Sequence, residues 1–137
     1  MAKLIAWTEE MSVGVAILDE DHKRIMKMIN KLHAAMQEGK GRDIMADIIH
    51  DLFVYINLHF ETEEEMFERT GYEGTSEQKA QHSAMKVKSL ELKQSYIASP
   101  ESIAPIEILL FLKDWWLGHI MHTDKKYAPF LNAHGIR

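Results

Sequence analysis

The sequence contains no cysteine, and it has only three prolines and seven glycines among its 137 residues. The absence of cysteine excludes disulfide bonds, iron–sulfur clusters, thiolate zinc sites and a cysteine nucleophile, so any bound metal must be held by nitrogen and oxygen donors. The scarcity of proline and glycine argues against a turn-rich β-sandwich and favours a few long elements. The length predicts a single domain that spans residues 1–137.

The sequence also lacks an excess of positive charge and a long uncharged apolar run. Sixteen basic and 21 acidic residues give a net charge of −5, so a surface that neutralises nucleic-acid phosphates is not expected. The most apolar window, residues 103–118, contains Glu107, Lys113 and Asp114, and a membrane span needs about 18 uncharged apolar residues. Residues 1–10 do not have the pattern of a secretory signal peptide. We therefore expect a cytoplasmic protein with no membrane span and no nucleic-acid partner.

Turn signals at residues 39–41, 71–74 and 99–100 divide the chain into four segments of helical length that follow an irregular N-terminal arm. Each segment carries apolar residues at a spacing of three and four, which is typical of a helix with one buried face. Because the connections are short, neighbouring helices should be antiparallel. The sequence therefore predicts an all-α fold, an up-down-up-down four-helix bundle.

Candidate helix starts can also be read from the sequence. Asp43 is a candidate N-cap of the second helix, and Thr75 or Ser76 of the third helix. Pro105 should lie in the first turn of the fourth helix, where proline is favoured.

Eight histidines are an unusual content for a chain of this length. Several polar side chains interrupt the apolar stripes, at positions that should face the core. Because odd and even helices run in opposite directions, these side chains should meet at one end of the bundle. Burying them without partners would cost several kcal/mol, so they must satisfy one another or a bound ion. The polar residues on the stripes are His22, His59, Glu63, Gln78, His82 and His119.

The spacing of these residues points to metal binding. His59 and Glu63 are four residues apart and differ by about 40° around a helix, so both project inward. Asp124 follows His119 by five residues, about 140°, so both face inward only if the helix loosens or ends between them, as in a π-bulge. Imidazole and carboxylate donors predict a metal centre, and two carboxylates suggest two ions. Iron, manganese and zinc all suit these donors.

Over essentially the whole chain the sequence resembles the hemerythrin family, in particular its single-domain bacterial members. This resemblance implies a four-helix bundle with two non-haem iron ions (Fe2+/Fe3+), joined by an oxo or hydroxo bridge, that binds O2 reversibly. It favours an oxygen carrier, store or sensor over an enzyme. The residues that carry the resemblance are Trp7, Val13-Gly14-Val15, Leu18-Asp19 before His22, His59-Phe60, Glu63-Glu64, His119-Ile120, and the run from Asp124 to Leu131.

The resemblance also implies a role for each site residue. His22 and His59 would bind the iron that keeps an open position, and His82 and His119 would bind the other iron. Glu63 and Asp124 would bridge the two ions. Apolar neighbours would line a dry pocket that admits O2 and slows proton entry, although the same residues are also expected as ordinary core. These neighbours are Ile25, Ile56, Trp116 and Ile120.

Gln78 departs from the family pattern, which has a histidine pair four residues apart in the third helix. Gln78 then donates its amide oxygen to the iron, or water takes the position, or the iron stays one ligand short; alternatively, Gln78 only hydrogen-bonds a water or a carboxylate. Each alternative predicts weaker metal retention. His122 is a candidate replacement ligand, but it lies about 60° from His119 on the side away from Asp124, which argues against it.

Other functions remain as alternatives to O2 binding. One is a di-iron oxidase or peroxidase, in which an extra open position on the Gln78 iron lets peroxide react. Another is a metal-poor helical interaction domain whose site has decayed. A phosphotransfer bundle that uses an exposed His50 would leave the buried cluster unexplained. A ferritin-like oxidase is disfavoured because the sequence has no Glu-x-x-His pair. His33, His50 and His134 are not ligand candidates.

Overall fold

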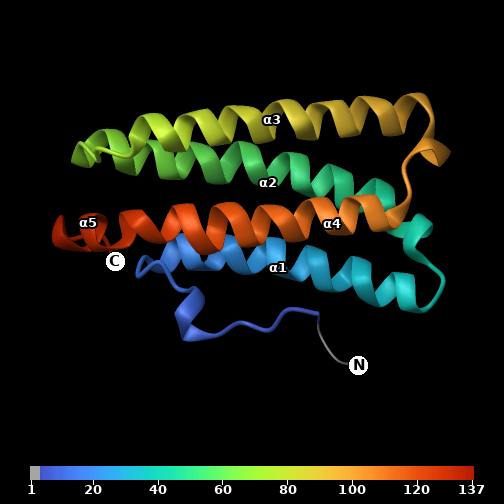
Figure 1. Ribbon diagram of the computed structural model, residues 1–137, viewed down its shortest axis with the longest axis horizontal. Helices are drawn as coiled ribbons and strands as arrows, with labels where there is room; N and C mark the ends of the chain where they lie inside the picture. The colour runs from blue at the N-terminus through green and yellow to red at the C-terminus, as the bar shows by residue number, and fades with distance from the viewer. Residues whose placement is uncertain (1–3) are drawn as a thin grey trace.

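The computed structural model describes residues 4–137, and four long antiparallel helices form its bundle (Figure 1). Helix α1 packs on α2 and α4, and α2 packs on α3. The predicted all-α, up-down-up-down architecture is confirmed. The helices are α1 (Ala16–Gln37), α2 (Gly41–Thr70), α3 (Thr75–Ala98), α4 (Pro105–Trp115) and the short α5 (Ala128–Ala133); the π-helical stretch η3 (Trp116–Thr123) and the 3-10 turn η4 (Asp124–Tyr127) join α4 to α5, and 3-10 turns η1 (Glu9–Met11) and η2 (Pro100–Ser102) complete the order.

The helix ends agree with the turn signals, but the predicted N-caps are wrong. Helix α2 begins at Gly41, so Asp43 lies inside its first turn. Its negative charge there still interacts favourably with the positive end of the helix dipole. Helix α3 begins at Thr75, whose hydroxyl donates to the carbonyl of Tyr72 at 2.5 Å instead of accepting a backbone N–H. Pro105 is the first residue of α4, as predicted.

The irregular N-terminal arm is tied to α1 by side-chain hydrogen bonds. The amide of Asn30 pairs with both backbone groups of Ile5, at 2.9 and 2.7 Å. Nearer the helix start, the Asp19 carboxylate accepts from the Val13 N–H at 2.8 Å and from the Ser12 hydroxyl at 2.5 Å. These contacts fix where α1 begins and therefore where its first buried residues lie.

A polar layer separates two apolar clusters along the bundle. On α1 the order along the helix is apolar Leu18, then His22, then apolar Ile25, and all three are fully buried. On α2, Glu63 lies in the same way between Phe60 and Phe67. The larger cluster fills the long part of the bundle. The smaller cluster closes the end beyond the polar layer, with Val13, Val15, Leu18, Phe67, Tyr127 and Leu131.

Candidate metal centre

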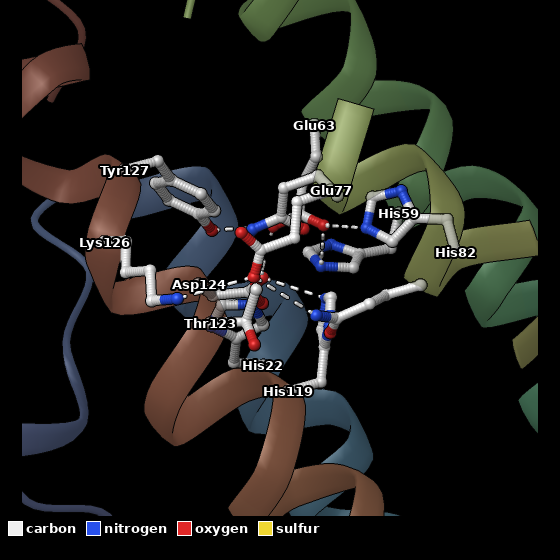
Figure 2. Close-up of polar contacts among 12 residues, drawn as sticks. His22, His59, Glu63, Glu77, His82, His119, Thr123, Asp124, Lys126 and Tyr127 are labelled. Atoms are coloured by element: carbon white, nitrogen blue, oxygen red, sulfur yellow. Dashed lines mark hydrogen bonds and ion pairs between the residues drawn. The ribbon is translucent and has the colours of Figure 1, made fainter. Parts of the chain in front are cut away.

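Each long helix, or its continuation, contributes to the polar layer at one end of the bundle. Four histidine rings converge on two carboxylates at the centre of this layer (Figure 2). All seven predicted site residues are at most 3% exposed, so no bulk water reaches their donor atoms. The structure brings together His22 from α1, His59 and Glu63 from α2, Gln78 and His82 from α3, His119 from η3 and Asp124 from η4.

The change of helix type in η3 allows both His119 and Asp124 to face the core. The backbone N–H of Asp124 donates to the carbonyl of His119, five residues earlier. This i→i+5 pattern is that of a π-helix, and it puts residues five apart on one face. The predicted loosening of the helix between the two residues is confirmed.

The Asp124 carboxylate faces histidines from two sides of the layer. Its Oδ1 atom lies 2.9 Å from Nε2 of His119, and its Oδ2 atom lies 3.1 Å from Nε2 of His22. Two ligands of one first-row metal ion, each about 2.1 Å from the ion, lie about 3 Å apart when they are adjacent. Each oxygen of Asp124 and the histidine nitrogen that it faces therefore have the spacing of two ligands of one ion, so the carboxylate could bind an ion on each side.

Glu63 also faces histidines on both sides of the layer, but through a single oxygen. Its Oε1 atom lies 3.2 Å from Nε2 of His59 and 3.1 Å from Nε2 of His82. Its other oxygen, Oε2, accepts a hydrogen bond from the hydroxyl of Tyr127 at 2.6 Å, which fixes the carboxylate. The donor atoms form two groups, each with its atoms within 4.8 Å of one another: His22, His59, Glu63 and Asp124 in one, and Glu63, His82 and His119 in the other.

The atoms that point into the layer have no hydrogen-bond partner among the described residues. This holds for Nε2 of all four histidines, for Oε1 of Glu63 and for Oδ2 of Asp124. Buried polar atoms without partners are rare and costly, so their convergence calls for a bound group. Nitrogen and oxygen donors at these spacings fit metal ions held between the imidazoles and the carboxylates.

Three of the four histidines are oriented by a polar contact at Nδ1, the ring nitrogen that points away from the layer. The sequence did not indicate the residues that make these contacts. In each pair, a residue next to a ligand candidate on one helix contacts the Nδ1 atom of a histidine on the following helix. Such contacts orient a metal-binding imidazole and select its tautomer. The pairs are Asp21 Oδ2 with His59 at 2.9 Å, Glu64 Oε2 with His82 at 3.1 Å, and Gln81 Oε1 with His119 at 2.5 Å.

Aromatic rings stack on the same three histidines. Stacking at these distances restricts rotation of the imidazoles and excludes water from their faces. Nothing in the residue types alone distinguished these rings from ordinary core. The stacked pairs are Tyr55 on His59 (5.1 Å between centroids, 12° between planes), Phe60 on His82 (3.9 Å, 3°) and Trp115 on His119 (4.0 Å, 14°).

The electrostatics of the layer favour a positive charge at its centre. Burial opposes ionisation of Glu63, but His59 and the other imidazoles outweigh it and hold the pKa of this carboxyl well below its usual range. Burial likewise opposes protonation of His59, yet the charge of Glu63 and the hydrogen bond that His59 donates to Asp21 raise the pKa of His59 to about 10. Burial and the charges of Glu63 and Asp124 raise the pKa of Tyr127 well above its usual value, which keeps its hydroxyl a donor.

Gln78 lies in the His82/His119 half of the layer. Its Nε2 donates to Oδ1 of Asp124 at 3.0 Å, and its Oε1 is buried with no partner among the described residues. His122, the candidate replacement, is exposed, so the structure does not bring it into the layer. The remaining histidines also lie outside the layer: His33 is half-buried, and His50 and His134 are exposed.

A four-helix bundle with a buried histidine and carboxylate layer defines a helical metal-binding protein. The family model described as Hemerythrin HHE cation binding domain matches residues 13–131, and the chain belongs to the hemerythrin family. It is 30% identical over 131 residues to Bacteriohemerythrin of Stenotrophomonas maltophilia (strain R551-3), covering 96% of this chain and 84% of that protein. Identity to Bacteriohemerythrin of Methylococcus capsulatus is also 30% over 131 residues, covering 95% of this chain and 98% of the relative.

Solved structures show the same fold. A crystal structure of wild-type hemerythrin matches with a TM-score of 0.82 and 31% identity, and it covers 93% of this chain and 98% of that one. A leucine-to-alanine variant of hemerythrin matches with a TM-score of 0.84 and 30% identity, covering 95% and 98% of the two chains. Among residues 4–137, no helix has both the length and the apolar character needed to cross a membrane.

Proposed function

We propose that the polar layer holds two iron ions and that the protein binds O2 reversibly, as an oxygen carrier, store or sensor. The observation that carries this proposal is the convergence of buried donor atoms that lack partners on two shared carboxylates. Membership of the hemerythrin family supports iron as the metal.

The two groups of donor atoms suggest how the ions are held. His22 and His59 would hold one ion and would leave it room for O2, and His82 and His119 would hold the other. Glu63 and Asp124 belong to both, because their oxygens face histidines on both sides. Two buried carboxylates offset part of the metal charge, and neutral imidazoles add donors without adding charge.

Gln78 serves the His82/His119 half through its amide oxygen. Oε1 of Gln78 is buried without a partner, while Nε2 of the same amide anchors Asp124, so both ends of the side chain have a role. An amide oxygen is a weaker donor to iron than an imidazole nitrogen. The ion in this half is therefore held less tightly than a third histidine would hold it.

The rest of the chain keeps the site dry and its donors fixed. Iron, when bound, supplies the reversible electron exchange with O2. The buried side chains of Ile25, Ile56, Trp116 and Ile120 belong to the apolar cluster beside the layer and exclude water. Excluding water limits the supply of protons, which favours release of O2 over irreversible oxidation.

The direct test is iron loading followed by oxygenation. The purified protein is reconstituted anaerobically with ferrous iron, the iron content is measured, and absorption spectra are recorded through repeated cycles of air and argon. The proposal expects two iron ions per chain and a visible band that forms with O2 and is lost under argon. Iron content well below two, or a spectrum that does not respond to O2, would overturn it.

A di-iron oxidase or peroxidase is the second candidate, and Gln78 is the observation that favours it. If the amide left the iron, that ion would gain an open position at which peroxide reacts. Peroxide turnover with an added reductant, lost in Gln78→His, would support this alternative. Equal turnover in both proteins would argue against it.

A further inference from the structure

Metal binding does not account for every buried polar atom without a partner. Among the described residues, bound ions would satisfy Nε2 of the four histidines and the unpartnered oxygens of Glu63, Gln78 and Asp124. Three atoms remain: Nδ1 of His22, Nε1 of Trp115 and the hydroxyl of Tyr55. Of these, only the Tyr55 hydroxyl lies at the far end of a long side chain that stacks on a histidine of the His22/His59 half.

The position of Tyr55 places its hydroxyl beside this half of the layer. Tyr55 precedes His59 by four residues, and Glu63 follows His59 by four, so the three side chains lie in one row on the inner face of α2. The phenol ring is nearly parallel to the imidazole, with 5.1 Å between the centroids and 12° between the planes. A tyrosine reaches further from the backbone than a histidine, and the hydroxyl is buried in the interior of the bundle.

The hydroxyl is a buried hydrogen-bond donor without an acceptor. Tyr55 is only 1% exposed, and its hydroxyl has no hydrogen-bond partner among the described residues. The hydroxyl of Tyr127 already donates to Glu63, at 2.6 Å. The Tyr55 O–H therefore has a free hydrogen at the half of the layer that the proposed function leaves open to a ligand.

We propose that the Tyr55 hydroxyl donates a hydrogen bond to the small ligand that binds in the His22/His59 half, either O2 or a small anion such as azide. This inference rests on the proposed function, since it needs iron in that half. An incoming acceptor would satisfy a donor that is otherwise costly to bury. Hydrogen bonds to charged groups contribute about 1.5–3 kcal/mol, so loss of the donor should weaken binding by about 10- to 100-fold.

Tyr55→Phe tests the inference, because it removes the hydroxyl and keeps the ring on His59. Tyr96→Phe is the matched control, since Tyr96 lies at the opposite end of α3 from the layer. Iron content is measured first in all three proteins. The oxidised iron-loaded proteins are then titrated with azide, and the infrared stretching band of bound azide is compared in H2O and D2O.

We expect two iron ions in each protein, azide affinity lowered about tenfold or more in Tyr55→Phe alone, and a D2O-sensitive azide band that loses its sensitivity in that variant. Equal azide affinity and an unchanged band in Tyr55→Phe, with iron content intact, would overturn the inference and leave the proposed function standing. Lower iron content with unchanged azide affinity per site would also overturn it, because the hydroxyl would then support iron retention and not the bound ligand. Wild type without iron would overturn both.

The metal-free proteins provide a readout that does not depend on iron. Removing a buried donor without a partner should leave the thermal unfolding temperature of metal-free Tyr55→Phe unchanged or raised. A lowered unfolding temperature would show that the hydroxyl has a partner inside the protein, and this result would overturn the inference.

Discussion

The carboxylate of Asp21 lies 2.9 Å from Nδ1 of His59, so a residue on α1 orients an imidazole on α2. The same relationship recurs from α2 to α3 and from α3 to η3, through Glu64 and Gln81. Each helix therefore helps to set the donor geometry of the next, and the layer is assembled only when all four helices pack.

Replacing Asp21 tests this arrangement. Asp21→Ala removes the acceptor behind His59, so the ring can rotate and its Nε2 is no longer aimed into the layer. We expect metal affinity to fall by about 10- to 100-fold, as is usual when such an outer partner is lost. Competition with a chelator measures the affinity, and Asp51→Ala, which alters an exposed acid on α2, is the control. Equal affinities in the two variants would contradict the role of Asp21.

Removing the hydroxyl of Tyr127 should lower stability. Tyr127→Phe leaves Oε2 of Glu63 buried without its donor, and the loss of a hydrogen bond to a charged group costs about 1.5–3 kcal/mol. Urea unfolding of the metal-free protein measures the change. Tyr72→Phe is the control, because this half-buried ring packs on Tyr127 without contacting Glu63, and it should change stability by less than about 0.5 kcal/mol. An unchanged free energy of unfolding in Tyr127→Phe would contradict the role of this hydroxyl in stabilising the buried Glu63 carboxylate.

Gln78 variants test the weaker half of the layer. Gln78→His supplies an imidazole in place of an amide, so we expect tighter retention of the second iron, by about tenfold or more. Gln78→Leu removes the donor and should lower the second equivalent of iron while the first is kept. Dialysis against a chelator followed by iron analysis measures both. His122→Ala is the control, since that side chain is exposed, and loss of iron in this variant alone would show that His122 is a ligand.

Metal removal should destabilise the whole bundle. A ligand that binds only the folded state at 1,000 times its dissociation constant adds about 4 kcal/mol, which for a domain of this size raises the unfolding temperature by roughly 10–15 °C. Calorimetry with and without ferrous iron, under argon, measures the shift. An unchanged unfolding temperature would instead favour a metal-poor interaction domain.

The fold followed from the sequence because its strongest signals are local. Apolar residues repeat at helical spacing through each long segment, and the glycines at 39 and 71 adopt left-handed conformations that end α1 and α2. The spacing from His119 to Asp124 also predicted the irregular helix between them, because residues five apart do not lie on one face of a regular α-helix. The N-caps failed because α2 and α3 begin at or before the residues chosen, and which residue starts a helix depends on contacts outside the segment.

The supporting residues of the layer could not be identified from the sequence. Asp21, Glu64 and Gln81 have the residue types of a solvated helix face, and their roles depend on which neighbouring helix they approach. Tyr55 and Trp115 occupy positions where an aromatic side chain serves as core. Their position in the sequence is a signal that could have found them, because Asp21, Glu64 and Gln81 each lie next to a ligand candidate in the chain.

If the proposed function is right, Glu63 and Asp124 lie between two metal ions in one buried layer. Anomalous diffraction from crystals of the iron-loaded protein tests it, since iron atoms are located individually. We expect two peaks, one beside His22 and His59 and one beside His82 and His119, with both carboxylates in contact with both. A single peak, or peaks at surface residues outside the layer, would contradict it.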